Sequence, residues 1–129
     1  MKIRVKFFDD NFVEAIKAGI YEIYLQINGK EELLYIGESV FVLVRCATHL
    51  YEVAKGNGYL GFTDELLKNE DITLVFKLYR SVDDKENRKK LEKALIIKKR
   101  PIMQSGISDR VKSIENMIDE LTHLLEKQH

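Results

Sequence analysis

The feature that most constrains the fold of this chain is a strong β-hairpin signal. Residues 20–27 and 32–37 are rich in β-branched and aromatic side chains, and they flank Asn28-Gly29. An Asn-Gly pair readily occupies the two positive-φ positions of a tight hairpin turn, so the segment predicts two antiparallel strands. The hairpin opens with Gly-Ile-Tyr at residues 19–21 and closes with the reversed tripeptide at residues 35–37.

The register of this hairpin decides whether Tyr21 and Tyr35 share a face of the sheet. In an antiparallel pair, the residue numbers of opposed residues always add to the same sum, and neighbours along a strand face opposite sides of the sheet. Tyr21 and Tyr35 therefore share a face only if this sum is even. A two-residue turn pairs Ile27 with Lys30, which gives an odd sum and places the tyrosines on opposite faces. A three-residue loop pairs Gln26 with Lys30, which gives an even sum and places them on the same face.

Apolar spacing predicts the other elements. The near-continuous apolar character of residues 72–79 favours a central strand, covered on both faces. Strands and helices alternate irregularly, so the predicted fold class is α+β, with a small, mainly antiparallel sheet flanked by helices. We expect an edge strand or arm at 2–7, a short helix at 10–18, a helix from Ser39 to the glycines after Lys55, a short helix at 63–68 capped by Thr63, and a helix at 84–99 that ends before Pro101.

The C-terminal segment has the spacing of a coiled-coil seam. Its apolar residues recur at alternating steps of four and three, which predicts an amphipathic helix packed on its own domain or at a homodimer contact. The expected organisation is therefore an N-terminal extension at 1–18, a main domain at 18–104 and a terminal helix at 105–129. The seam residues are Ile107, Val111, Ile114, Ile118, Leu121 and Leu125.

Composition indicates one domain in a reducing compartment. The chain has 129 residues, of which 45% are hydrophobic, but no apolar run long enough to cross a bilayer. Its first residues become charged too early for a secretory signal, and Cys46 is the single cysteine, so no internal disulfide forms. We expect a cytoplasmic protein without a membrane segment.

Formal charge balances overall but not locally. Lys plus Arg and Asp plus Glu both total 21, whereas residues 85–100 carry eight basic and two acidic side chains. Such a run is either a solvated helix face or a surface that binds the phosphates of a nucleic acid. The candidate phosphate-binding residues are Lys89, Lys93, Lys98, Lys99 and Arg100.

Taken singly, the other polar candidates have ordinary explanations. Arg45 and His49 lie one helical turn apart and away from the apolar stripe of their helix, which is typical of a solvated pair. Glu92 has lysine neighbours on its own helix, and tyrosines in strands usually pack in cores. Taken together, GIY at 19–21, YIG at 35–37, Arg45 eight residues later, and Glu92 nine residues before a proline resemble the GIY-YIG nuclease domain over residues 18–104.

The resemblance implies a metal-dependent endonuclease that hydrolyses DNA phosphodiester bonds, and the sequence leaves RNA open as the alternative substrate. By position, Tyr21 helps to deprotonate the attacking water, and Tyr35 hydrogen-bonds at the scissile phosphate or its water. Arg45 neutralises phosphoryl oxygens, His49 matches a histidine of some members, and Glu92 ligates one Mg²⁺ or Mn²⁺. The resemblance also implies supporting roles for Gly19, Gly37 and Gln104.

The chemistry of hydrolysis fits these residue types. An arginine fork binds phosphate oxygens bidentately, and a metal held by one carboxylate keeps positions open for the substrate. A phenol has a free pKa near 10, so Tyr21 needs the arginine, the phosphate or His49 to lower that pKa or to accept its proton.

Two residues depart from the family pattern. Glu38 stands where many members have lysine, and Gln104 stands where members often have asparagine. These departures keep two alternatives open, a catalytically impaired nucleic-acid-binding relative and an interaction module that works through the terminal seam.

Overall fold

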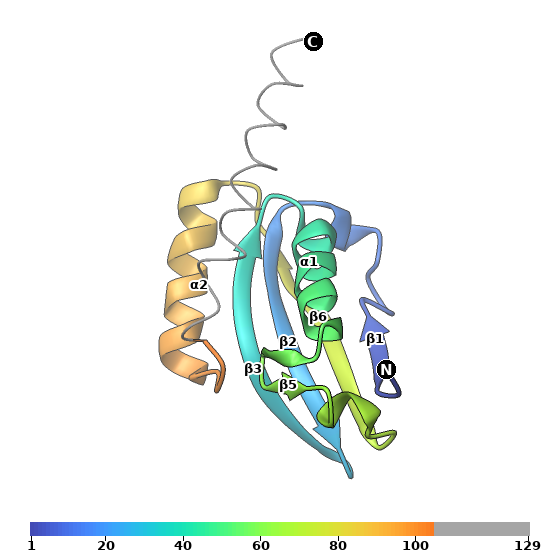
Figure 1. Ribbon diagram of the computed structural model, residues 1–129. Coiled ribbons are helices and arrows are strands. Elements are labelled where there is room, and N and C mark those ends of the chain that lie inside the picture. Colours follow the sequence, from blue (N-terminus) through green and yellow to red (C-terminus); the bar gives the residue numbers. More distant parts are fainter. Residues whose placement is uncertain (105–129) are drawn as a thin grey trace.

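Two helices cover a four-stranded sheet in the computed structural model, which describes residues 1–104 (Figure 1). Short 3₁₀ turns and a second, two-stranded sheet complete the described part. In chain order the elements are β1 (Arg4–Phe7), η1 (Glu14–Ile16), β2 (Gly19–Ile27), β3 (Lys30–Ser39), α1 (Val42–Ala54), β4 (Asn57–Tyr59), β5 (Phe62–Thr63), η2 (Leu66–Lys68), β6 (Ile72–Ser81) and α2 (Lys85–Lys99).

The main sheet confirms the predicted α+β class. Its strand order is β1-β6-β2-β3, in which β2 runs antiparallel to both of its neighbours and β1 runs parallel to β6. The apolar segment at 72–79 lies within β6, an inner strand, as predicted. β1 is an edge strand of the same sheet rather than a detached arm.

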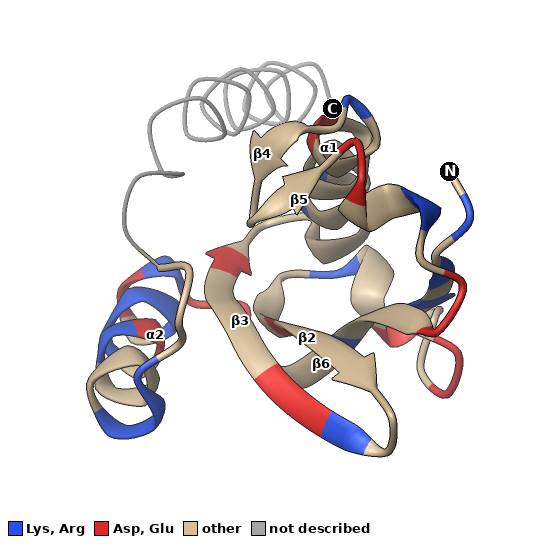
Figure 2. Ribbon diagram, turned by 60° about the horizontal axis from the view of Figure 1, so that its bottom comes forward, with Lys and Arg blue, Asp and Glu red and all other residues tan. Residues whose placement is uncertain are grey.

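The two helices lie on opposite sides of the sheet. Helix α1 packs with the larger core cluster, which includes Tyr21, Tyr35 and Phe76. Helix α2 packs beside β3 over a smaller cluster formed by Ile20, Ile36 and Leu95 (Figures 1 and 2). Neighbouring residues of β2 and β3 therefore pack on opposite faces of the sheet, because side chains alternate between the two faces along a strand.

The hairpin has neither of the two uniform registers expected from its sequence. Asn28 and Gly29 form a two-residue turn with φ of 51° and 78°, so Ile27 pairs with Lys30. A β-bulge then changes the register, because Tyr24 pairs with Leu33 whereas Ile23 pairs with Tyr35. Because β3 has one extra residue at the bulge, the sum of the paired residue numbers changes from odd to even. Tyr21 and Tyr35 therefore share the face that α1 covers.

Short elements differ from their predictions. Residues 10–18 contain only the 3₁₀ turn Glu14–Ile16 instead of a helix. Thr63 does cap the turn at 66–68, where its Oγ1 accepts a hydrogen bond from the Leu66 backbone at 3.2 Å, although that turn is also 3₁₀. The glycine-rich residues after α1 form the β4–β5 hairpin, because glycines at 56, 58 and 61 adopt positive φ.

Helix α2 begins and ends as predicted. The Asp84 carboxylate accepts a hydrogen bond from the Asn87 backbone at 2.8 Å, which caps the first turn. Arg100 adopts the left-handed conformation at the C-terminal end, immediately before Pro101. The chain then returns along β3, where the Met103 backbone donates a hydrogen bond to the Leu34 carbonyl at 2.8 Å.

Two further predictions concern the C-terminal seam and membrane-spanning helices. The coiled-coil seam, Ile107 to Leu125, lies outside the described residues. Of the helices in residues 1–104, none combines the length and the apolar character needed to cross a bilayer.

Candidate active site

The buried face of α1 carries charged and polar residues. Arg45, His49 and Glu52 are all buried, on the same face as Cys46 and Val53. The interpretation of Arg45 and His49, taken singly, as a solvated pair is therefore wrong. Their hydrogen-bonding atoms have partners on strands, and a partner is what makes burial of such groups tolerable.

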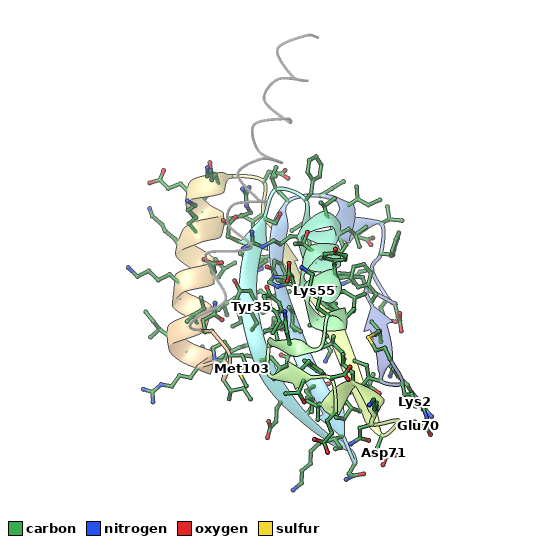
Figure 3. All side chains as sticks on the ribbon, in the orientation of Figure 1. Lys2, Tyr35, Lys55, Glu70, Asp71 and Met103 are labelled. Carbon is green, nitrogen blue, oxygen red and sulfur yellow. The ribbon has the colours of Figure 1, made fainter. Side chains whose placement is uncertain are left out.

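Tyr21 connects the strand and the helix at the centre of this face. Its hydroxyl lies 2.8 Å from His49 Nε2, and it accepts a hydrogen bond from Arg45 Nε at 3.2 Å. The Tyr35 ring lies between β3 and α1 (Figure 3), with its centroid 5.0 Å from that of His49 and 6.2 Å from that of Tyr21. Four of the five predicted catalytic residues are thus in one cluster.

A fifth member of the cluster, Tyr59, was not predicted. Its hydroxyl lies 2.8 Å from His49 Nδ1, so both ring nitrogens of His49 are hydrogen-bonded. Tyr59 belongs to β4, and its side chain is buried. Its one sequence signal is its position in the glycine-rich segment after α1, which by itself indicates only a turn.

Gly37 makes room for the Tyr21 ring in the hairpin. It lies directly opposite Tyr21 in the β2–β3 register. A β-carbon at Gly37 would overlap the hydroxyl and ring of Tyr21. Gly19 is similarly crowded, because its β-carbon would lie 2.6 Å from the Arg80 carbonyl oxygen on β6. Close packing against Tyr21 therefore requires Gly37, and close packing against β6 requires Gly19.

Replacing Gly37 with alanine is expected to destabilise the protein by about 3 kcal/mol, because Tyr21 is fully buried and cannot move aside. In a Tyr21→Leu background, which lacks the clashing ring atoms, the same replacement should cost less than about 1 kcal/mol. Urea denaturation of the four proteins measures this difference. Equal costs in both backgrounds would contradict the packing argument.

Burial dominates the protonation of the cluster. It raises the pKa of Tyr21 well above the ordinary value, and the nearby Arg45 guanidinium opposes this effect only in part. Burial also raises the pKa of Tyr35. The charge of Arg45 and its hydrogen bond to Tyr35 oppose this effect only in part. The pKa of His49 falls to about 3, first because of burial and then because of the Arg45 charge. At neutral pH both phenols are protonated and the imidazole is neutral.

Glu92 approaches the cluster from α2. Its side chain is half-buried, and its negative charge contributes to the raised pKa of Tyr35. Within residues 1–104, no three His, Cys, Asp or Glu side chains gather in a way that could hold a metal ion by themselves. A single carboxylate is nevertheless a usual protein contribution to a Mg²⁺ site, where phosphate and water oxygens complete the coordination.

Glu38 does not present an isolated charge to the cluster. Arg88 of α2 donates from Nε to its carboxylate at 2.9 Å, and Arg88 Nη1 donates to the Asp83 carbonyl at 2.8 Å. The Arg88 side chain is 5% exposed and that of Glu38 is 15% exposed. This ion pair joins α2, which carries Glu92, to the end of β3.

Gln104 has the hydrogen-bonding capacity expected of a supporting amide. Its Oε1 accepts from the Ile36 backbone N–H at 3.0 Å, and its Nε2 donates to the Ile36 carbonyl at 2.9 Å. The side chain therefore extends the edge of β3 next to Tyr35 and Gly37. Glutamine at this position holds the middle residue of the second tripeptide through both backbone groups.

The basic residues of α2 are not equivalent. Lys99 Nζ pairs with the Glu22 carboxylate at 2.7 Å, and it lies over the Tyr79 ring. Lys99 thus stabilises the contact between helix and sheet. The other four candidate phosphate-binding residues, Lys89, Lys93, Lys98 and Arg100, are exposed, and basic positions dominate this helix in Figure 2.

Comparisons of the chain with protein-family models, curated proteins and solved structures found no match.

Proposed function

We propose that this protein is a metal-dependent endonuclease that hydrolyses DNA phosphodiester bonds. The observation that carries the proposal is the hydrogen-bonded cluster of Tyr21, Arg45 and His49, with Tyr35 in ring contact and the Glu92 charge nearby. These groups come from β2, β3, α1 and α2. Tyrosine, arginine and one carboxylate are the residue types that phosphodiester hydrolysis requires and that the resemblance to GIY-YIG nucleases implies.

The cluster has an inner and an outer part. Tyr21 and His49 are fully buried, whereas Tyr35 and Arg45 retain 4% and 5% exposure and Glu92 is half-buried. The outer residues are therefore those that meet a phosphate. Arg45 offers a planar, permanently charged fork to the phosphate oxygens, and such a donor is worth several kcal/mol of transition-state stabilisation.

The inner pair receives the proton of the attacking water. A free tyrosinate is costly here because burial raises the pKa of Tyr21. The phenol avoids ionisation if it passes its own proton to His49 Nε2, 2.8 Å away, while its oxygen accepts the proton of the water. An anionic phosphate next to the cluster favours the protonated imidazole and so offsets part of the burial that lowers the pKa of His49.

Glu92 is the residue that would hold a divalent ion. Mg²⁺ or Mn²⁺ bound there supplies Lewis-acid stabilisation of the phosphate. The exposed cations of α2 lie on the same helix and favour binding of a polyanion.

The test is cleavage of supercoiled plasmid DNA in Mg²⁺ and in Mn²⁺. We expect conversion to nicked circles, and we expect Glu92→Gln and Tyr21→Phe each to lower the rate by on the order of 100-fold or more. Glu86→Gln is the matched control, because Glu86 is an exposed acid on the same helix and pairs with Lys90 in the following turn. Absence of cleavage by the unmodified protein in both metals would overturn the proposal.

A catalytically impaired nucleic-acid-binding module is the second candidate. The complete burial of Tyr21 and its raised pKa favour this candidate, because both lower the reactivity of the phenol. DNA binding without cleavage, lost when Lys89 and Lys93 are replaced with glutamate, would support it over the nuclease.

A further inference from the structure

His49 has a hydrogen-bond partner on each side of its ring, and its side chain is fully buried. Its exposed fraction is 0%, its Nε2 lies 2.8 Å from the Tyr21 hydroxyl, and its Nδ1 lies 2.8 Å from the Tyr59 hydroxyl. A neutral imidazole carries one ring proton, so one nitrogen donates and the other accepts. The two tyrosines therefore determine which tautomer His49 adopts.

Arg45 sets the direction of the hydrogen bond on the Tyr21 side. The guanidinium Nε can only donate, so the Tyr21 oxygen accepts from it at 3.2 Å. The phenolic proton is then available to His49 Nε2. If Nε2 were protonated instead, Tyr21 would receive two donors, and its own proton would lack an acceptor among the contacts that Tyr21 makes within residues 1–104.

The same assignment of donors and acceptors also fits the hydrogen bond between His49 and Tyr59. With Nε2 as acceptor, the ring proton is on Nδ1 and points to the Tyr59 oxygen. The Tyr59 oxygen can accept this proton, so both ring nitrogens of His49 keep a hydrogen-bond partner in this order. The hydrogen bond at one imidazole nitrogen generally determines the state of the other.

We propose that Tyr59 is a positioning residue for the active site, which accepts the His49 Nδ1 proton and so keeps Nε2 free to take the proton of Tyr21. The β4–β5 hairpin is the element that brings it there, because β4 contacts α1 and places the buried Tyr59 side chain behind His49. The hairpin is thus part of the site rather than a simple connection. The role in cleavage rests on the proposed function, whereas the tautomer itself does not.

The direct test is nuclear magnetic resonance of the protein with ¹⁵N-labelled histidine at neutral pH. Comparison with His49→Gln assigns the His49 signals, and the nitrogen shifts report which ring nitrogen is protonated. We expect the Nδ1–H tautomer in the unmodified protein. Tyr59→Phe removes the acceptor but keeps the ring, so the population should shift toward Nε2–H, which can donate to Tyr21.

Tyr51→Phe is the matched control, because Tyr51 follows His49 by two residues on α1 and is 66% exposed. It should leave the tautomer unchanged. A predominant Nε2–H form in the unmodified protein would overturn the inference. An unchanged tautomer in folded Tyr59→Phe would overturn it as well.

Cleavage separates this inference from the proposed function. If the protein is a nuclease, Tyr59→Phe should lower kcat roughly tenfold or more with little change in KM, because Tyr59 orients a proton acceptor without touching the substrate. A protein that cleaves no DNA but has the expected tautomers would contradict the nuclease proposal alone. Full activity of Tyr59→Phe together with a shifted tautomer would show that Tyr59 has no role in cleavage.

Discussion

Acidification from pH 6.5 to pH 3 is expected to lower the free energy of unfolding by on the order of 4 kcal/mol through His49 alone. The folded-state pKa of His49 is lowered from 6.5 to about 3, with burial as the main cause. Between these two values the unfolded chain binds a proton that the folded protein does not bind. Stability therefore rises with pH across this window, by about 1.4 kcal/mol per pH unit, and the contribution is complete above about pH 6.5.

The measurement is urea denaturation from pH 4 to pH 7 of the unmodified protein and of His49→Gln. Glutamine can still donate and accept hydrogen bonds, but it does not titrate. The carboxylates and the two remaining histidines, His123 and His129, are common to both proteins, so their titration cancels in the difference. A difference in unfolding free energy that does not change with pH would show that His49 accepts a proton in the folded state as readily as in the unfolded chain.

Replacing Arg88 with methionine is expected to destabilise the protein by about 3–5 kcal/mol. Arg88 and Glu38 are both largely buried and share a hydrogen bond of 2.9 Å. Removal of the arginine leaves the Glu38 carboxylate without its charge partner at the interface of α2 and β3. The loss also loosens the helix that carries Glu92, so the rate of the proposed metal-dependent cleavage should fall together with stability.

Two variants test the origin of this effect. Combining Arg88→Met with Glu38→Leu should recover much of the lost stability, because two packed apolar side chains often replace a buried ion pair without loss. Lys90→Met is the matched control on the same helix, since Lys90 and Glu86 are 72% and 79% exposed, and it should cost less than about 1 kcal/mol. If Arg88→Met costs no more than Lys90→Met in urea denaturation, the buried pair is not the anchor of α2.

Much of the fold was predictable because its signals are local. Asn28-Gly29 marked the position of the hairpin turn although not its length, and Asp84 and Pro101 marked the ends of α2. The bulge in β3 had no such signal. Leu34 and Tyr35 are adjacent, yet both pack in the larger core cluster, which a regular strand does not allow. The extra residue at the bulge allows both side chains to be buried in that cluster.

The candidate site was predicted as a set of residues but not as an arrangement. The apolar stripe of α1 suggested that Arg45 and His49 face solvent, because amphipathic patterning treats charged residues as exposed. Both are buried, since hydroxyl groups distant in the sequence bind them. Tyr59 was not predicted for the same reason, because its partner, His49, lies on another element, α1.

The sequence by itself determined the position of the turn, the ends of α2, the α+β class and the residue types gathered at the two tripeptides. These features depend on interactions between residues a few positions apart, which any local segment carries with it. The tertiary structure alone decided that Tyr21 and Tyr35 share a face, that Gly37 makes room for the Tyr21 ring, and that Tyr59 lies behind His49. Those outcomes depend on the register of paired strands and on which buried polar groups find partners, and both are settled only when distant segments pack together.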